Sequence, residues 1–135
     1  MGAWDHTIFG NDTACDWKYE VEESDDLTVI EQTIDKLIEF EGDYIEAPEA
    51  EEALAAIETI TRLKGNGGEK NSYTESLDSW VESHPQEIPQ SLIEKGNKAI
   101  GLILSGQSEL LELWTESNEA GWKKTVVDLQ ERLNK

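Results

Sequence analysis

The sequence predicts an all-α protein, a single-domain bundle of about six to seven helices with an N-terminal non-helical arm. Hydrophobic residues recur at spacings of three and four almost everywhere after residue 10, which places them on one face of a helix. The 135 residues are about the size of one domain, which we expect to span residues 1–135. Leu, Ile, Val and Phe number 31 of these residues, enough to form a core in spite of the high charge.

The predicted arm covers residues 1–10, where Trp4, Ile8 and Phe9 lie among glycines and polar residues without a helical repeat. We expect Trp4 to hold the arm against the bundle. The alternative is that Trp4 is an exposed anchor for a partner. The other four tryptophans fall on apolar helical stripes, so we interpret them as core residues.

Three helices are predicted in the first half of the chain. The first begins at Asn11 or Asp12, because either side chain can accept hydrogen bonds from unpaired N–H groups of a first turn. The second carries an apolar stripe over residues 27–38 and stops at Gly42. The third starts with Pro48, which suits a first helical turn because its missing N–H would be unpaired there anyway.

A glycine-rich break follows the third helix. Three glycines in the four positions from Gly65 to Gly68 are too costly for a helix interior, so residues 65–72 are predicted to form a flexible linker between two halves. The run resembles a phosphate-binding loop only superficially. It follows a helix instead of a strand, and neither Ser nor Thr comes directly after Lys70.

Four further helices are predicted in the second half, over residues 74–83, 90–104, around 108–114, and from a cap at Asn118 to Leu133. The segment 90–104 carries two adjacent apolar rows. We therefore expect it to be the most buried helix and to lie at the centre of the bundle.

The formal net charge of −19 is concentrated in one part of the chain. Residues 1–58 hold 18 acids and only two bases, a net charge of −16, whereas residues 59–135 hold 12 acids and nine bases, a net charge of −3. This balance argues against direct binding of nucleic acid or of an anionic membrane. The sequence has no long apolar run and no signal-like N-terminus, so we expect a cytoplasmic protein.

An acidic helical face attracts a basic protein, so the sequence suggests a small, non-enzymatic, immunity-like or inhibitor-like binding module that acts through its N-terminal half. The candidate partner-binding residues are Glu20, Glu22, Glu23, Asp25, Asp26, Glu39, Glu41 and Asp43. A related hypothesis is that this acidic face mimics nucleic acid. The plain alternative is that these carboxylates only keep the protein in solution.

The sequence offers little for catalysis, so we expect no catalytic residue, no cofactor and no metal. Neither His6 nor His84 has the spacing of a helix-borne metal site. Cys15 lies beside Asp12 and Asp16, which should raise the pKa of its thiol and work against a reactive thiolate. We therefore interpret Cys15 as a small core residue. The alternative function is a cation-dependent hydrolase or metal-binding protein. Its candidate ligands are Asp5, His6, Asp12 and Asp16.

The first 17 residues, MGAWDHTIFGNDTACDW, resemble the opening of a bacterial family known as domain of unknown function 4259. Members begin Met-Gly-x-Trp, continue to a Phe, and then read Asn-Asp-x-Ala-x-Asp-Trp. The segments GDYIEA at residues 42–47 and SELLELW at residues 108–114 extend the resemblance over essentially the whole chain. In this sequence Asp5 and Thr7 replace glycines that are common between the Trp and the Phe. The resemblance implies a small, mostly helical bacterial protein and supplies no catalytic residue.

Overall fold

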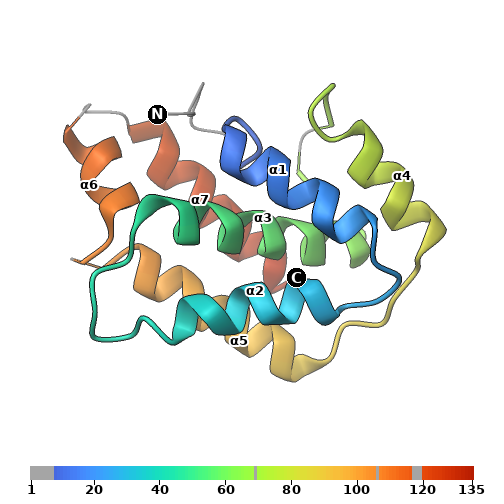
Figure 1. Ribbon diagram of the computed structural model, residues 1–135, viewed down its shortest axis with the longest axis horizontal. Coiled ribbons are helices and arrows are strands. Elements are labelled where there is room, and N and C mark those ends of the chain that lie inside the picture. The colour runs from blue at the N-terminus through green and yellow to red at the C-terminus, as the bar shows by residue number, and fades with distance from the viewer. Residues whose placement is uncertain (1–7, 69, 106, 117–119) are drawn as a thin grey trace.

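The computed structural model describes residues 8–68, 70–105, 107–116 and 120–135. These residues form an all-α bundle (Figure 1), as the hydrophobic spacing predicted. Its helices are α1 (Asp12–Glu22), α2 (Thr28–Ile38), α3 (Ala47–Leu63), α4 (Glu75–Ser83), α5 (Gln90–Ile103), α6 (Glu109–Glu116) and α7 (Ala120–Leu133).

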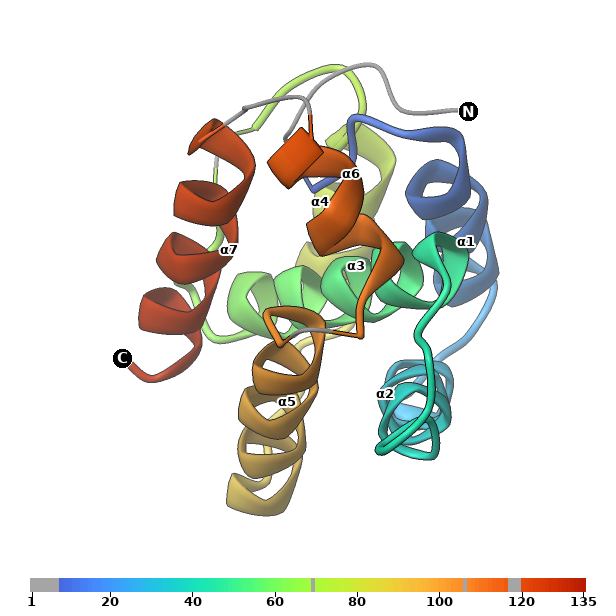
Figure 2. The ribbon, with the colours of Figure 1, turned by 90° about the vertical axis from the view of Figure 1, so that its left-hand side faces the viewer.

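Helix α3 lies at the centre of the bundle and packs against each of the other six helices (Figure 2). Every residue from Ala53 to Arg62 is buried, so this helix has no solvent-facing side over almost three turns. The prediction that the segment 90–104 would be central is therefore wrong. Helix α5 buries its first apolar row and Ile100 of its second row, but Ile93 and Leu104 of the second row remain partly exposed.

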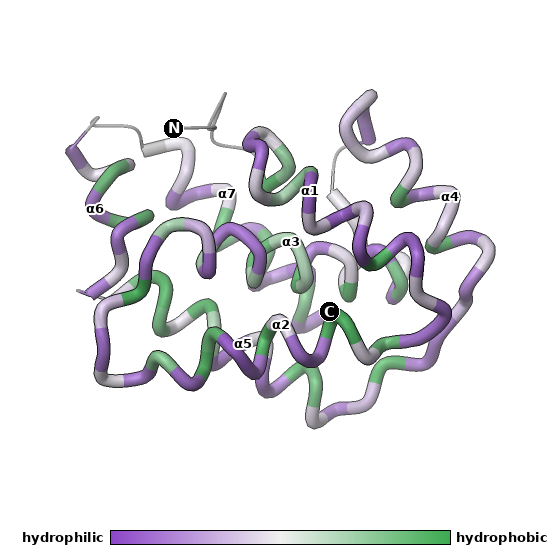
Figure 3. Tube along the Cα trace, in the orientation of Figure 1, coloured by the Kyte–Doolittle hydropathy of each residue, from purple (hydrophilic) through white to green (hydrophobic). Residues whose placement is uncertain are grey.

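Small side chains explain the central place of α3. Ala50, Ala53, Ala55 and Ala56 are all fully buried, and an alanine surface lets neighbouring helix backbones approach closely. In Figure 3, hydrophilic and hydrophobic residues alternate along the surrounding helices, and the buried apolar residues of these helices form one core cluster with those of α3. The core is thus arranged around α3.

The helix boundaries largely follow the predicted signals. Asn11 caps α1, where its side-chain oxygen accepts a hydrogen bond of 2.7 Å from the backbone N–H of Ala14. Pro48 lies in the first turn of α3, as predicted, and Gly65 follows α3 with a positive φ of 84°. Helix α2 ends at Ile38, four residues before Gly42, which instead closes the turn after the helix with a φ of 89°.

Several predictions concern the ends of the chain. Ile8 and Phe9, from the predicted arm, are buried against the bundle. Trp4 and the rest of residues 1–7 lie outside the described residues, as does Asn118, the predicted cap of the last helix. The apolar ladder of α7 is confirmed, with Trp122, Val126, Leu129 and Leu133 all buried. Within the part of the chain that the structure describes, no helix has the length and apolar character needed to cross a membrane.

Candidate functional site

The predicted partner-binding carboxylates reach solvent but form two separate groups. Seven of the eight are exposed, and Glu22 is partly exposed. Five of them, from Glu20 to Asp26, lie at the end of α1 and in its connection to α2. The other three, from Glu39 to Asp43, follow the far end of α2 (Figure 1). The 11 residues of α2 separate the two groups by roughly 16 Å.

The first group has little positive charge beside it. Lys18 is the base nearest to it in sequence, yet only 4% of this residue is exposed. Its Nζ donates a hydrogen bond of 3.1 Å to Ser76 Oγ and lies 4.7 Å from the centre of the Tyr19 ring. The ammonium group is therefore held between α1 and α4, while Tyr19 itself is 56% exposed.

Helix α4 is fastened beside α1 and extends this acidic region. Ser76 Oγ donates to Glu22 Oε2 at 2.8 Å, and Trp80 Nε1 donates to the backbone oxygen of Ser24 at 2.8 Å. At the end of α4, His84 Nε2 lies 3.3 Å from Asp25 Oδ1. No Lys or Arg occurs between Lys70 and Lys95, so α4 contributes acids without bases.

We call the resulting region the α1–α4 acidic surface, and it comprises Glu20, Glu22, Glu23, Asp25, Asp26, Glu75 and Glu82. Glu75 and Glu82 are exposed, and charge counts do not single them out because they lie in residues 59–135, where the net charge is only −3. Residues 71–94, which include α4, contain no Lys or Arg, and this was the sequence signal that could have identified the two acids. The side chains of Glu20, Glu23, Glu75 and Glu82 form no ion pair or hydrogen bond with any residue that the structure describes.

The second group is partly neutralised. Glu41 pairs with Lys98 of α5, with 3.0 Å between Oε1 and Nζ. Lys95 Nζ of α5 lies 3.0 Å from both Glu31 Oε2 and Asp35 Oδ1 of α2. The acids on the side of α2 that meets α5 therefore have lysines of α5 beside them, in contrast to the α1–α4 acidic surface.

The candidate metal ligands are not brought together among the described residues. Asp12 and Asp16 are exposed on α1, and Asp5 and His6 lie outside the described residues. In residues 8–68, 70–105, 107–116 and 120–135, no three His, Cys, Asp or Glu side chains are grouped so that they could hold a metal ion.

Cys15 has the environment of a structural thiol. It is partly buried, and its Sγ donates to the backbone oxygen of Phe9 at 3.3 Å. Burial raises the pKa of this thiol, Asp12 and Asp16 raise it further, and Lys18 opposes them. The effect of the two aspartates has the expected sign, although burial is the largest cause.

A buried ion-pair network joins α3 to α7. Arg132 holds Glu58 with two hydrogen bonds, 2.8 Å from Nη2 to Oε1 and 3.1 Å from Nη1 to Oε2. On the other side of the carboxylate, Arg62 Nε lies 3.1 Å from Oε2, and the N–H of Gly68 donates to the same oxygen at 2.9 Å. Only 3% of the Glu58 side chain is exposed, so one buried carboxylate serves two guanidinium groups.

Two further acids complete this Glu58 network. Asp78 of α4 pairs with Arg62 Nη1, and Thr74 Oγ1 donates to Asp78 Oδ2 at 3.0 Å. Asp128 Oδ2 accepts a hydrogen bond of 2.9 Å from Arg132 Nε. The network therefore connects α3, α4 and α7. Sequence reasoning missed it, because Glu58 and Arg62 look like an ordinary surface pair four residues apart.

The glycine-rich run is fitted closely to the network. A Cβ atom at Gly67 would lie 2.5 Å from Arg62 Cγ, and one at Gly68 would lie 3.2 Å from the guanidinium carbon of Arg132. These two glycines therefore allow the backbone to approach the arginines. The run lies between α3 and α4, and the N–H of Gly68 donates a hydrogen bond to Glu58.

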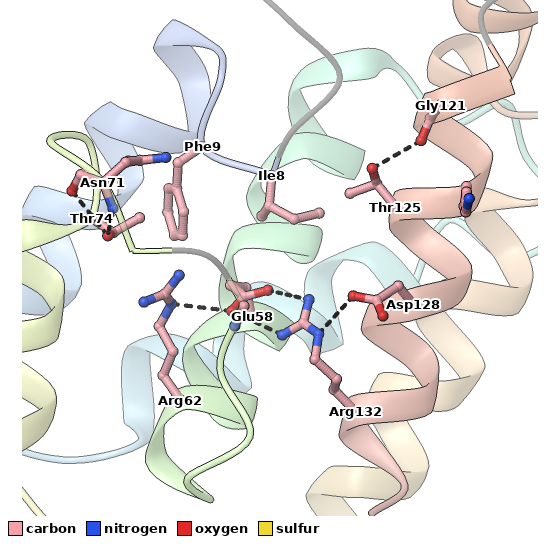
Figure 4. Close-up of a pocket in the computed structure, with 12 residues that line it drawn as sticks. Ile8, Phe9, Glu58, Arg62, Asn71, Thr74, Gly121, Thr125, Asp128 and Arg132 are labelled. Atoms are coloured by element: carbon pink, nitrogen blue, oxygen red, sulfur yellow. Dashed lines mark hydrogen bonds and ion pairs between the residues drawn. The ribbon is translucent and has the colours of Figure 1, made fainter.

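A cavity of about 500 Å³ lies above this network (Figure 4). Its lining combines the apolar pair Ile8 and Phe9 with residues of α3, of the α3–α4 connection and of α7. The polar and charged lining residues are Glu58, Arg62, Asn71, Thr74, Lys124, Thr125, Asp128 and Arg132. Figure 4 shows the Arg132 guanidinium between the carboxylates of Glu58 and Asp128, with Ile8 above it.

Comparisons with known proteins identify a family but no activity. No curated protein and no solved structure matches the chain. One family model matches residues 2–125, which is most of the sequence and includes α1 to α6. The chain belongs to the family described as Domain of unknown function (DUF4259).

Proposed function

We propose that this protein is a non-catalytic binding module that engages a basic protein through the α1–α4 acidic surface, as an immunity or inhibitor protein engages its target. The observation that carries the proposal is that five carboxylates at the end of α1 and in its connection to α2, with two more exposed on α4, reach solvent while Lys18, the base nearest to them in sequence, is buried. An uncompensated acidic surface accelerates encounter with a basic partner and repels nucleic acid.

The composition of the surface also favours binding to protein. Tyr19 is 56% exposed beside Glu20 on α1. Tyrosine is enriched in protein interfaces because its ring offers contact area at a low cost in conformational entropy. A basic partner with an aliphatic or aromatic side chain among its lysines and arginines would match this combination.

Parallel capture from an extract of the native host tests the proposal. The baits are the wild-type protein and a neutralised variant that carries Glu20→Gln, Glu22→Gln, Glu23→Gln, Asp25→Asn and Asp26→Asn. Amide side chains keep the hydrogen-bonding capacity of Glu22 toward Ser76 and of Asp26 toward the N–H of Thr28, so the variant changes mainly charge. We expect the wild type to retain a basic protein that the neutralised variant loses.

A matched control removes five exposed acids elsewhere, through Glu46→Gln, Glu94→Gln, Glu112→Gln, Glu116→Gln and Glu131→Gln. The control bait should retain the same partner as the wild type, and raising the salt concentration should release that partner from both. Equal retention by the neutralised variant and the control, or no basic protein that depends on the surface, would contradict the proposal.

A further inference from the structure

The cavity above the Glu58 network has the dimensions and lining of a small-molecule site. Its volume of about 500 Å³ is within the usual range for ligand pockets, roughly 300–1,000 Å³. Three bases line it, Arg62, Lys124 and Arg132, against two acids, Glu58 and Asp128. In a chain with 30 acids and only 11 bases, this concentration of bases in one cavity is unusual.

The buried Glu58 carboxylate has little acceptor capacity left for a ligand. Oε1 of Glu58 accepts from Arg132, and Oε2 accepts from Arg132 and from the N–H of Gly68, with Arg62 Nε also 3.1 Å away. A carboxylate oxygen accepts about two hydrogen bonds, so the protein saturates Oε2, and Oε1 keeps one acceptor position on a side chain that is 3% exposed. Asp128 uses one oxygen on Arg132, and its side chain is 60% exposed to water at the cavity edge.

Unpaired hydrogen-bond donors also remain at this end of the cavity. Arg132 has five N–H groups. Its Nε donates to Asp128, its Nη1 to Glu58, Thr61 and Asn66, and its Nη2 only to Glu58, which leaves one Nη2 N–H without a partner among the described residues. The ammonium group of Lys124 likewise forms no ion pair with a described residue. The lining therefore suits a ligand that is rich in acceptors.

The opposite wall is apolar. Ile8 and Phe9 are buried at 9% and 4% exposure, yet both line the cavity. Figure 4 shows their side chains on the side of the cavity opposite the guanidinium groups. A ligand that fills the space would place an apolar part against them and a charged part toward α7.

We propose that this cavity binds a small organic anion, in which one oxyanion group is attached to an apolar body. The oxyanion accepts hydrogen bonds from Arg132 Nη2 and Lys124 Nζ, and the body packs on Ile8 and Phe9. The strongly negative charge elsewhere on the protein opposes such a ligand only weakly, because physiological salt screens charges beyond about 8 Å. This site is separate from the α1–α4 acidic surface and does not depend on the function proposed for that surface.

Calorimetric titration of the full chain tests this proposal with four probes. Phenyl phosphate and phenylacetate carry both required parts, inorganic phosphate carries only the oxyanion, and phenol carries only the apolar ring. We expect at least one of the first two to bind saturably, and the single-part probes to bind at least about tenfold more weakly. Which of the two binds more tightly distinguishes a phosphate ligand from a carboxylate ligand. If neither binds saturably up to about 10 mM, or if inorganic phosphate or phenol binds as tightly, the proposal is wrong.

Two neighbouring lysines provide a matched pair of variants. Both lysines are exposed on α7, but Lys124 lines the cavity and Lys123 does not. We expect Lys124→Ala to weaken the better probe at least about fivefold and Lys123→Ala to change its affinity less than about twofold. An equal loss in both variants would show diffuse attraction to surface charge and would overturn the assignment of the site.

Discussion

The α1–α4 acidic surface and the Glu58 network contain the same type of side chain, a carboxylate, in opposite environments. Glu20 and Glu23 are exposed and have no hydrogen-bond or ion-pair partner among the described residues. The Glu58 side chain is 3% exposed, accepts hydrogen bonds from Arg132 and from the N–H of Gly68, and forms an ion pair with Arg62. Removing a partner from a buried ion pair is costly, while exposed charges contribute little to stability. The comparison shows that an enclosed carboxylate in this chain is paired with arginines, whereas exposed carboxylates remain in contact with solvent.

The largest expected effect is at Glu58. Glu58→Ala leaves the guanidinium groups of Arg62 and Arg132 without their shared carboxylate, so we expect the free energy of unfolding to fall by about 3–5 kcal/mol. Urea denaturation followed by circular dichroism measures this loss of unfolding free energy. Glu23→Ala is the control on the acidic surface, and it should change the free energy of unfolding by less than about 0.5 kcal/mol. Similar values for the two variants would remove the distinction between the two regions.

A smaller effect is expected when the acidic surface itself is neutralised. In low salt, the neutralised variant should be as stable as the wild type or more stable, by up to about 1 kcal/mol, because repulsion among the carboxylates is removed. The same denaturation experiment measures it. A marked loss of stability would mean that these carboxylates hold the fold together, as Glu58 does.

The smallest effect concerns two carboxylates of α3 with intermediate burial. Burial raises the pKa of Glu51, a hydrogen bond involving Thr13 opposes this shift, and Glu109 and Asp12 add to it. Burial likewise raises the pKa of Glu52, Lys36 opposes the shift, and Glu49 and Glu20 add to it. Both groups therefore bind protons more tightly in the folded state than in the unfolded state. Their contribution to stability is present below their ordinary pKa and is lost as the pH rises through the raised values.

The double variant Glu51→Gln, Glu52→Gln mimics the protonated forms of both groups. We expect its melting temperature at pH 7 to exceed that of the wild type by about 1–3 °C, and the difference to vanish below about pH 4. Thermal unfolding at several pH values measures both effects. The exposed residue Glu46 supplies the control, since Glu46→Gln should give no such pH-dependent difference. A double variant that is less stable than the wild type at pH 7 would contradict the argument.

The sequence predicted the helices well because local signals determine them. The cap at Asn11, the first-turn Pro48 and the apolar ladder of α7 need only neighbouring residues. The central helix was misassigned because α3 includes Glu58, Thr59, Thr61 and Arg62 in its buried stretch. Such a sequence looks amphipathic until partners from other helices satisfy its polar groups.

The cavity and its network could not be predicted, because their partners are distant in sequence. Glu58 and Arg132 are 74 positions apart, and one sequence alone does not show that they meet. The acidic surface was partly predictable, since charge counts identified Glu20 to Asp26. They did not identify the contribution of α4, which depends on the packing of Trp80 and Ser76 against the end of α1.

The salt dependence of stability tests the central claim most directly, namely that the α1–α4 acidic surface is uncompensated in the isolated protein. The free energy of unfolding is measured at several NaCl concentrations from about 0.01 to 0.5 M for the wild type, the neutralised variant and the five-site control. We predict that salt stabilises the wild type and the control, and that this gain is clearly smaller in the neutralised variant. An equal gain in all three proteins would contradict the claim.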